Sequence, residues 1–216
     1  MIDDTEELYD YDVLRRLDEP SMMVVRVSSP VLVLGSAQPS SLVRLDDAPP
    51  LRRRRGGGGL VLLQPDDLWV DWWIPSTDPR WRADVRSTSL LAGEWWRDAL
   101  ASYGVTGEIH RGGADNDPVA SVACFAGRGP GEVFVEGRKA VGVTQWRVRE
   151  GAFLSTVLPA SPTAHLGQWL RTPVDDLEQV LSHAVVGEWD VDPEDLLEEL
   201  ALRSAPVRRR QLFLIA

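Results

Sequence analysis

The sequence predicts an α+β fold in which a mixed, largely antiparallel sheet is flanked by helices. Short β-branched and apolar runs dominate the middle of the chain, whereas amphipathic helical patterns occur in only a few segments. The strands and helices do not alternate in the regular way that a parallel sheet with crossover helices requires. With 216 residues, of which 44% are hydrophobic, the chain can bury one substantial core. We therefore expect a single domain over residues 1–216.

The first half of the chain is expected to contain mainly strands. The acidic residues 5–18 include scattered leucines and a valine and predict a first helix. A Ser-Ser-Pro sequence and a Gln-Pro-Asp-Asp sequence indicate turns between apolar runs. The strands predicted from these runs are residues 22–27, 31–34, 60–63 and 68–74.

A long helix is expected over residues 85–103, because apolar side chains recur there at helical spacing and Gly104 supplies a stop signal. Another helix should begin at Asp192, which can cap it, with Pro193 in its first turn. This helix should run to about residue 202, and an amphipathic helix over 174–185 should precede it. The remaining predicted strands are residues 121–125, 132–135, 140–147, 152–158 and 208–216.

Composition excludes several classes of function. A net charge of -10 disfavours a nucleic-acid partner, since phosphate binding needs a basic surface. No apolar run approaches the roughly 20 residues of a membrane span, and the acidic N-terminus lacks the order of a secretion signal. A cytoplasmic protein is therefore expected. The single cysteine, Cys124, excludes an internal disulfide and a cysteine-built metal site, and the scattered His110, His165 and His183 suggest no structural metal.

The basic residues are unusual, because Lys139 is the only lysine beside 22 arginines. A codon bias toward G and C would favour arginine at most basic positions. A position that remains lysine is then a candidate for a role that needs a compact ammonium rather than a planar guanidinium. The alternative is an exposed lysine in a hairpin, since Lys139 follows a Glu-Gly turn.

Four arginines followed by four glycines, residues 52–59, form the least ordinary segment. Consecutive glycines are costly to order, but they let a backbone approach a ligand closely and present bare N–H groups. Arginine beside such a loop can hold a carboxylate or phosphate through paired hydrogen bonds. A solvated basic linker is the alternative, although the apolar run that follows at once favours a loop within a sheet. The spacing matches neither a Walker loop nor a dinucleotide-binding loop.

Three segments together resemble the lipoate–protein ligase A family, within the wider biotin and lipoate ligase superfamily. They occur in the order found in that family and together cover roughly residues 25–160. Each alone is weak, but the three in order make a specific match. The segments are Leu34-Gly35-Ser36-Ala37-Gln38, Arg53-Arg54-Arg55-Gly56-Gly57-Gly58-Gly59-Leu60-Val61 and Gly137-Arg138-Lys139-Ala140-Val141-Gly142-Val143-Thr144-Gln145.

This resemblance implies a reaction and a set of partners. Such ligases use ATP and Mg²⁺ to convert lipoate, or a similar acid such as octanoate, into an acyl adenylate. They then transfer the acyl group to a lysine of a lipoyl-domain carrier, either the acyltransferase subunit of a dehydrogenase complex or the glycine-cleavage carrier protein. By resemblance, Lys139 bonds the acyl carbonyl and adenylate oxygens, and Glu132 lies near the nucleotide and Mg²⁺. The residues implied in substrate binding are Arg53, Arg54, Gly57, Gly58, Gly59, Gly142, Val143 and Thr144.

Two other interpretations remain open. Some relatives transfer octanoyl groups from acyl carrier protein through a cysteine thioester without ATP, and Cys124 lies in a segment similar to theirs. A third possibility is a non-catalytic acyl-binding member, or one subunit of a split ligase. The sequence departs from the family pattern at Leu63, where relatives often have histidine, and at Ser36, where they often have arginine. The tryptophans at positions 69, 72 and 146 are candidates either for an acyl tunnel or for the core.

Overall fold

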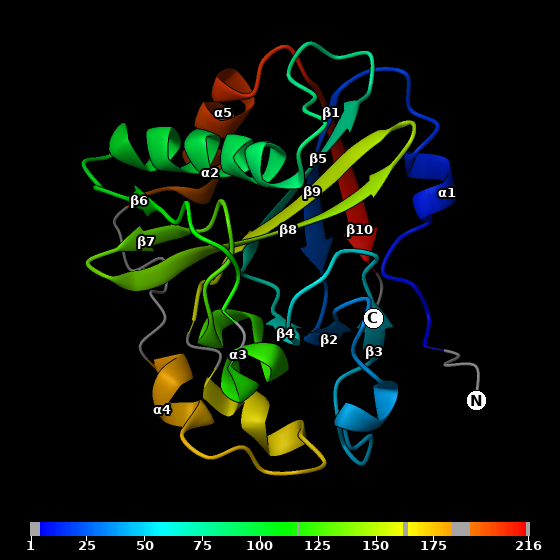
Figure 1. The fold of residues 1–216 in the computed structure, drawn as a ribbon, viewed down its shortest axis with the longest axis vertical. Helices are drawn as coiled ribbons and strands as arrows, with labels where there is room; N and C mark the ends of the chain where they lie inside the picture. Colours follow the sequence, from blue (N-terminus) through cyan, green and yellow to red (C-terminus); the bar gives the residue numbers. More distant parts are fainter. Residues whose placement is uncertain (1–4, 116, 162–163, 183–190, 215–216) are drawn as a thin grey trace.

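The computed structural model describes residues 5–115, 117–161, 164–182 and 191–214 (Figure 1). The strands within these residues are β1 (Ser21–Val27), β2 (Val31–Leu34), β3 (Leu51–Arg53), β4 (Val61–Leu63), β5 (Leu68–Pro75), β6 (Glu108–Ile109), β7 (Val133–Val135), β8 (Arg138–Val148), β9 (Gly151–Leu158) and β10 (Arg208–Leu214). The α-helices are α1 (Tyr11–Leu14), α2 (Val85–Ala101), α3 (Pro118–Val122), α4 (Leu177–Ser182) and α5 (Pro193–Arg203). Three 3₁₀ turns are η1 (Ser40–Leu42), η2 (Cys124–Ala126) and η3 (Ala164–Trp169).

The strands form two sheets. The larger has the order β10-β1-β5-β9-β8-β7-β6, and the smaller has the order β3-β2-β4. Pairing is antiparallel except between β1 and β10 and between β2 and β3. Every residue of β5 and β9, at the centre of the larger sheet, is buried. The predicted α+β class with a largely antiparallel sheet is therefore confirmed.

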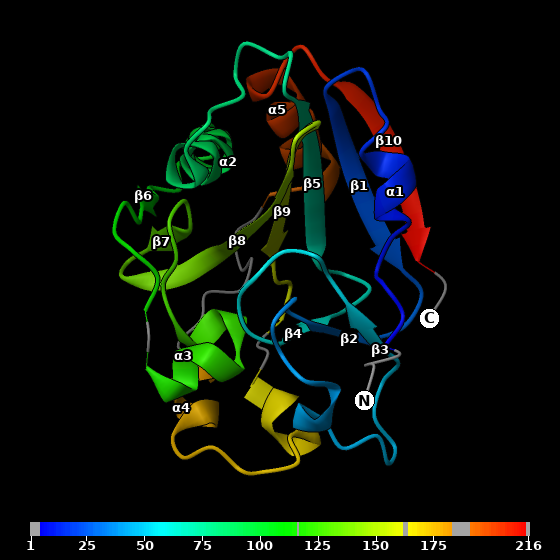
Figure 2. The ribbon, with the colours of Figure 1, turned by 45° about the vertical axis from the view of Figure 1, so that its right-hand side comes forward.

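Each face of the larger sheet has its own core, because alternate residues of a strand point to opposite faces. On one face, Trp72 and Leu154 pack with apolar residues of α2 and α5. On the other, Trp69 and Phe153 pack with the smaller sheet, α1 and α4. Figure 2 shows α2 and α5 together on one side of the sheet and α1 on the other. The chain thus places the smaller sheet, which leads into the glycine-rich segment, against the larger one.

The predicted strands at residues 22–27, 31–34, 60–63 and 68–74 are all present, but they do not form two hairpins. The turn after β1 leads from the larger sheet to the smaller one, and the turn after β4 leads back again. Apolar alternation identifies a strand and its buried face, whereas the choice of partner depends on contacts distant in sequence.

The first helix is much shorter than predicted. Only Tyr11–Leu14 is helical, with Asp10 as its N-cap. The residues before it are not helical, because Glu7 forms a parallel bridge with Arg53 and the amide of Leu8 donates to the Arg53 carbonyl at 2.8 Å. This pairing extends the smaller sheet and brings the N-terminal segment beside the glycine-rich loop.

The strand predicted at residues 121–125 is wrong. Helix α3 and the turn η2 occupy this segment instead. Asp117 caps α3 by accepting a hydrogen bond from the amide of Ala120 at 2.9 Å, and Pro118 lies in the first turn. The valines of this segment suggested a strand, but the aspartate–proline start signal outweighs them.

The C-terminal elements agree with prediction within a few residues. Helix α4 begins at Leu177 rather than 174, and α5 begins at Pro193 with Asp192 as its cap. Strand β10 begins at Arg208. The predicted continuation of α4 through residues 183–185, the end of the last strand at 215–216, and His183 lie outside the described residues. No helix of the described part is long and apolar enough to cross a membrane.

Candidate active site

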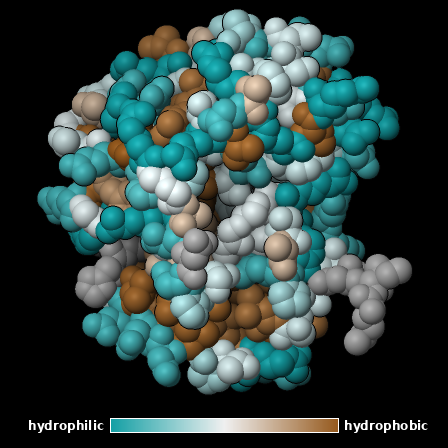
Figure 3. Space-filling model, viewed as in Figure 1, coloured by the Kyte–Doolittle hydropathy of each residue, from teal (hydrophilic) through white to brown (hydrophobic). Residues whose placement is uncertain are grey.

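A cavity of about 260 Å³ lies between the glycine-rich loop, the start of β8 and the loop that follows η2. Figure 3 shows this face of the molecule hollowed near its centre. The cavity is lined by Gly57, Gly58, Gly59, Cys124, Glu132, Lys139, Val143 and Thr144, among others. The structure therefore brings most of the site residues expected from the sequence around one space, although their roles remain predictions.

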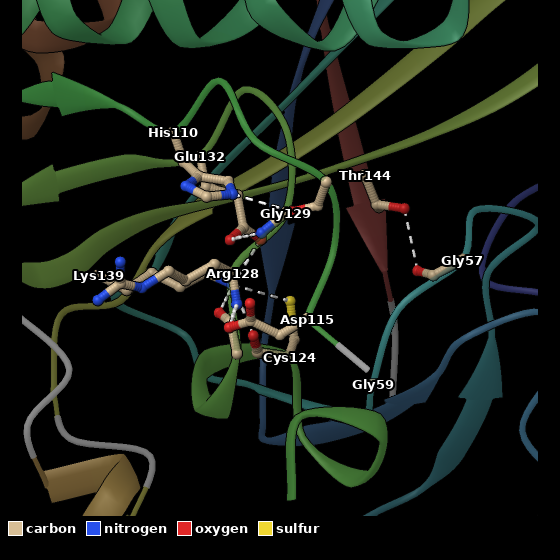
Figure 4. A network of polar contacts seen from close by, with 12 residues as sticks. Gly57, Gly59, His110, Asp115, Cys124, Arg128, Gly129, Glu132, Lys139 and Thr144 are labelled. Atoms are coloured by element: carbon tan, nitrogen blue, oxygen red, sulfur yellow. Dashed lines mark hydrogen bonds and ion pairs between the residues drawn. The ribbon is translucent and has the colours of Figure 1, made fainter. Parts of the chain in front are cut away.

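The ammonium of Lys139 is surrounded by oxygen atoms. The lysine follows a two-residue turn between β7 and β8 in which both residues, Glu136 and Gly137, have positive φ. Its Nζ lies 2.5 Å from Oε1 of Glu132 and donates hydrogen bonds to the carbonyls of Cys124 at 2.5 Å and Gly127 at 3.2 Å (Figure 4). Three oxygens thus match the three N–H bonds of the ammonium.

Lys139 and Glu132 form a buried ion pair. Burial lowers the pKa of Lys139, but the neighbouring Cys124 sulfur and Glu132 carboxylate raise it by more, so the pKa is raised overall. Burial raises the pKa of Glu132, against the lowering effect of Lys139. The other carboxylate oxygen, Oε2, accepts a hydrogen bond from the amide of Gly129 at 2.6 Å. The sulfur of Cys124 lies 3.8 Å from Nζ of Lys139. A ligand oxygen that binds Lys139 must therefore replace one of its existing oxygen partners.

Arg54 holds the glycine-rich loop in place through hydrogen bonds to backbone carbonyl groups. Its guanidinium is almost fully buried and donates to the carbonyls of Val33 at 3.1 Å, Gly57 at 2.8 Å and Gly59 at 2.7 Å. From the cavity side, the hydroxyl of Thr144 donates to the Gly57 carbonyl at 3.0 Å. The hydrogen bonds from Arg54 and Thr144 therefore fix the position of the loop relative to β8. Arg54 acts through the loop rather than by facing the cavity.

Two of the loop glycines are required by close approach or conformation. A Cβ on Gly59 would lie only 2.5 Å from the carbonyl carbon of Ala123, and Gly58 has a φ of +88°. A Cβ on Gly57, in contrast, would have no neighbouring atom within 4 Å, and this residue borders the cavity. A side chain at Gly57 would therefore enter the cavity, whereas one at Gly59 would displace backbone.

Arg53, the other arginine predicted to bind substrate, holds the Leu34–Gln38 segment instead. The guanidinium of Arg53 donates to the carbonyls of Gly35 at 3.0 Å and Gln38 at 2.5 Å and does not line the cavity. Gln38 donates in turn to the carbonyls of Ser121 and Val122 at 3.0 Å each. The Leu34–Gln38 segment therefore connects the glycine-rich loop to the chain that precedes Cys124.

The other residues that the sequence suggested for the site lie in different parts of the structure. Gly142 and Trp69 line a small inner space behind the cavity, which Arg54 also borders. Trp72 belongs to the core on the opposite face of the sheet. Trp146 packs edge-on against Tyr11, with ring centroids 5.3 Å apart. Of the three tryptophans, only Trp69 is therefore placed to contact a ligand from behind the cavity.

The loop between η2 and β7 is the part of the site that sequence reasoning missed. Gly127, Arg128, Gly129 and Pro130 all line the cavity. Arg128 is exposed, and its guanidinium lies 5.4 Å from the centre of the Phe134 ring. The Gly-Arg-Gly-Pro-Gly run of this loop was a signal of the same kind as the four glycines. Its position opposite the glycine-rich loop gives the cavity a second wall of exposed backbone and an arginine.

The donor set does not fit the Mg²⁺ role expected of Glu132. Both of its oxygens are engaged, one by an ammonium at 2.5 Å and the other by an amide. A divalent cation at that position would be repelled by Lys139. Among the described residues, no group of three histidine, cysteine, aspartate or glutamate side chains is placed to hold a metal ion. In this arrangement Glu132 serves to position Lys139 and the loop at Gly129.

Three solved structures share the fold across nearly the whole chain. The lipoate protein ligase Ta0514 of T. acidophilum with bound lipoic acid has a TM-score of 0.72 at 17% identity, covering 95% of this chain and 82% of its own. A lipoate-protein ligase A bound with ATP has a TM-score of 0.70 at 18% identity, covering 91% and 77%. A bipartite lipoate protein ligase described with its E2 lipoyl domain, from Thermoplasma acidophilum, has a TM-score of 0.72 at 16% identity, covering 95% and 80%.

The sequence itself supports the same assignment. No functionally curated protein matches it significantly. The model of the lipoyl protein ligase A/B catalytic domain, however, matches residues 6–184, which include both glycine-rich loops, Cys124 and Lys139. The chain therefore belongs to the family of lipoyl protein ligase A/B catalytic domains.

Proposed function

We propose that this chain is an acyl-protein ligase that activates lipoate or a similar carboxylic acid as its adenylate and transfers the acyl group to a lysine of a lipoyl domain. The observation that supports this most directly is the placement of Lys139 and Gly57–Gly59 on opposite walls of one cavity. A buried ammonium and a wall of bare backbone suit an activated acyl group, which carries negative charge on its phosphate and developing charge on its carbonyl.

The chain's residues then have separate tasks. The acid lies along the glycine-rich loop, which leaves room for its chain because Gly57 has no side chain. An oxygen of the acyl phosphate replaces the Gly127 carbonyl at Lys139, since that bond is the longest of the three at 3.2 Å. Arg128 and the amides of its loop meet the nucleotide phosphates. ATP supplies the adenylyl group, so the acid carboxylate displaces pyrophosphate and the lysine of the carrier later displaces AMP.

The lipoyl-domain partner is proposed by analogy with the archaeal ligase described with its E2 lipoyl domain. That ligase is bipartite, and this chain covers 80% of its solved chain. This chain could therefore form one catalytic domain that works alone or the larger part of a two-subunit ligase. Reconstitution separates the two, because a split ligase gives no acyl transfer until its second subunit is added.

Cys124 gives one specific reason to keep the octanoyltransferase alternative. Cys124 lines the cavity, and its sulfur lies 3.8 Å from Nζ of Lys139. In that reaction the thiolate attacks the thioester of octanoyl acyl carrier protein, the carrier leaves as its thiol, and the lysine of the lipoyl domain then takes the acyl group from Cys124. ATP is not consumed.

One set of assays tests both reactions. The protein is incubated with ATP, lipoate and a lipoyl domain, and separately with octanoyl acyl carrier protein and no ATP, while pyrophosphate and the mass of the lipoyl domain are measured. The ligase predicts ATP-dependent pyrophosphate release and a mass increase that survive Cys124→Ser. Transfer from acyl carrier protein that Cys124→Ser abolishes would establish the alternative. Lys139→Ala is expected to abolish either reaction, and full turnover by that variant would contradict both.

A further inference from the structure

The loop that leads into α3 brings a carboxylate to the rim of the cavity. Ala114 and Asp115 are exposed, and both line the cavity. The amide of Asp115 donates to the carbonyl of Arg128 at 2.8 Å, and Oδ2 of Asp115 accepts from the amide of Arg128 at 2.9 Å (Figure 4). These two hydrogen bonds hold the loop against the wall that follows η2, so the carboxylate has a defined position at the rim.

Asp115 and Glu132 are the two acidic residues that line the cavity within the described part of the chain. Glu132 is buried, and its charge is paired with that of Lys139. Asp115, in contrast, forms no ion pair with a described residue. The guanidinium of Arg128 lies over the ring of Phe134 instead, 5.4 Å from the ring centre. The negative charge of Asp115 is therefore available to a ligand, and a neutral oxygen would serve equally well to hold the amide of Arg128.

The proposed reaction has one cationic substrate. The acid and the nucleotide phosphates are anions, which a carboxylate at the rim repels. The acceptor is the amine of a carrier lysine, which is protonated at neutral pH and which a carboxylate binds through a charge-assisted hydrogen bond. Lys139 lies deeper, with its side chain only 3% exposed, whereas Asp115 is exposed. A lysine that enters from another protein can therefore contact Asp115 while it approaches an acyl group held at Lys139.

We propose that Asp115 forms the subsite for the acceptor, in which it binds the amine of the lipoyl-domain lysine and directs it toward the acyl group at Lys139. This inference rests on the proposed function and applies to either acyl donor, the adenylate or the Cys124 thioester. Asp115 touches the acceptor alone, whereas Lys139 and the glycine-rich loop hold the acyl group.

The transfer step assigns a place to each proton and electron pair. Before attack the ammonium releases one proton to solvent, and the neutral amine keeps one N–H bonded to Asp115. Its nitrogen then forms a bond to the acyl carbonyl carbon, while the bond from that carbon to AMP, or to the Cys124 sulfur, breaks. The leaving group takes the bonding electron pair, and the surplus proton on the nitrogen passes to solvent.

The test compares two nucleophiles on the same activated acyl group. The whole protein is given the acyl donor that the wild-type protein uses, either ATP with lipoate and Mg²⁺ or octanoyl acyl carrier protein. The acyl group is captured either by a lipoyl domain or by hydroxylamine, which is small and uncharged at neutral pH. The mass of the lipoyl domain, the acyl hydroxamate and, with ATP, the released pyrophosphate are measured.

Asp115→Asn removes the charge but keeps an oxygen that can accept from the amide of Arg128. It is expected to reduce kcat/KM for the lipoyl domain roughly five- to tenfold, mainly through KM, because the hydrogen bond to the acceptor is no longer charge-assisted. Hydroxamate formation is expected to stay unchanged, since hydroxylamine carries no positive charge. A purely structural role of Asp115 would change capture by both nucleophiles alike.

The matched control is Asp117→Asn. Asp117 lies two positions further along the same loop, is also exposed and caps α3, but it does not line the cavity. Asparagine caps a helix about as well as aspartate does, so the control removes a nearby negative charge and leaves the cap in place. It is expected to leave capture by the lipoyl domain and by hydroxylamine unchanged.

The outcomes separate this inference from the proposed function. Equal kcat/KM for the lipoyl domain in Asp115→Asn and the wild-type protein overturns the subsite, and so does a loss of equal size with both nucleophiles. If added Mg²⁺ restores such a common loss, the carboxylate binds the metal that accompanies ATP and not the acceptor. The acyl site itself stands in all of these cases. If the wild-type protein modifies neither nucleophile with either donor, the proposed function fails, and the subsite fails with it.

Discussion

Nζ of Lys139 lies 2.5 Å from Oε1 of Glu132, and the two side chains are only 3% and 4% exposed. Each charge is tolerated in the interior because the other is present and because Cys124, Gly127 and Gly129 supply further hydrogen bonds. The same pair fixes the loop that forms one wall of the cavity. Substitution of either residue is therefore expected to change both stability and activity, and the double variant separates the two effects.

We expect either single variant, Lys139→Met or Glu132→Leu, to lose about 3–5 kcal/mol of unfolding free energy, since each leaves an unpaired charge in the interior. The double variant should recover most of that loss, because no buried charge remains. Denaturant unfolding measures the free energies, and acyl transfer should be absent whenever Lys139 is replaced. Additive losses in the double variant would show that the two charges do not stabilise each other.

Gly59→Ala and Gly57→Ala are expected to behave differently although the residues are two positions apart. The added carbon of Gly59→Ala meets the backbone of Ala123 and Cys124, so a loss of about 1–3 kcal/mol is expected. At Gly57 the added carbon meets open space, so stability should change by less than about 1 kcal/mol. A larger side chain, Gly57→Leu, should fill part of the cavity and weaken acid binding at least tenfold without unfolding the protein.

Thermal unfolding and calorimetry measure these effects. The comparison is internal, because Gly57→Ala controls for loss of glycine flexibility in the same loop. If Gly59→Ala were as stable as the wild-type protein, the close packing between the loop and the residues before η2 would be wrong. If Gly57→Leu bound acids normally, the acid would not lie along this loop.

Much of the larger sheet could be predicted because its strands have clear apolar runs and turn signals. Its strand order could not, because β1 pairs with β10 and β5 across contacts that are remote in sequence. The segment at Pro118–Val122 shows a different limit. It begins with an aspartate and a proline, the same signal that correctly predicts α5, but its β-branched residues favour a strand, and the two signals conflict.

Some residues of the candidate site could likewise be predicted from the sequence, and others could not. Lys139 and the four glycines stand out by composition, and the structure places them at one cavity. The loop at Gly127–Pro130 was missed because it contributes mainly carbonyl and amide groups, which every sequence provides. The ion pair of Lys139 with Glu132 was also not foreseen, because the seven-residue separation brings the two together only through the β7–β8 hairpin.

Arg55 is expected to fasten the N-terminal segment to the glycine-rich loop. Its guanidinium pairs with Glu7 at 2.6 Å and lies 5.1 Å from the ring centre of Tyr11 and 4.9 Å from that of Trp146. Arg55→Met should cost about 1–2 kcal/mol, because a partly buried cation–π contact and an ion pair are lost. Amide hydrogen exchange should accelerate over residues 6–14.

The matched control for Arg55 is Arg16→Met, since Arg16 is an exposed arginine close to the same segment. It is expected to change neither stability nor exchange measurably. Equal exchange at residues 6–14 in Arg55→Met and the wild-type protein would mean that backbone pairing of Glu7 with Arg53 suffices to hold the segment.

The stability of the protein is expected to fall as the pH rises from about 4 to about 7. Burial raises the pKa of Asp71 from 3.8 to about 7, so the folded state binds a proton more tightly than the unfolded state. The stabilising effect of that proton is fully present below pH 4 and is lost as the pH passes through 7. A difference of about three pKa units corresponds to roughly 4 kcal/mol, and Asp71→Asn should remove this contribution to the pH dependence.

Asp67 provides a control for the assignment of this pH dependence to Asp71. Burial raises its pKa to about 6, so it contributes in the same direction but only up to that pH. The loss of stability between pH 6 and 7 should therefore disappear in Asp71→Asn and persist in Asp67→Asn. Denaturant unfolding at half-unit intervals of pH measures both. If Asp71→Asn keeps the same slope between pH 6 and 7 as the wild-type protein, the proton lost in this range does not belong to Asp71.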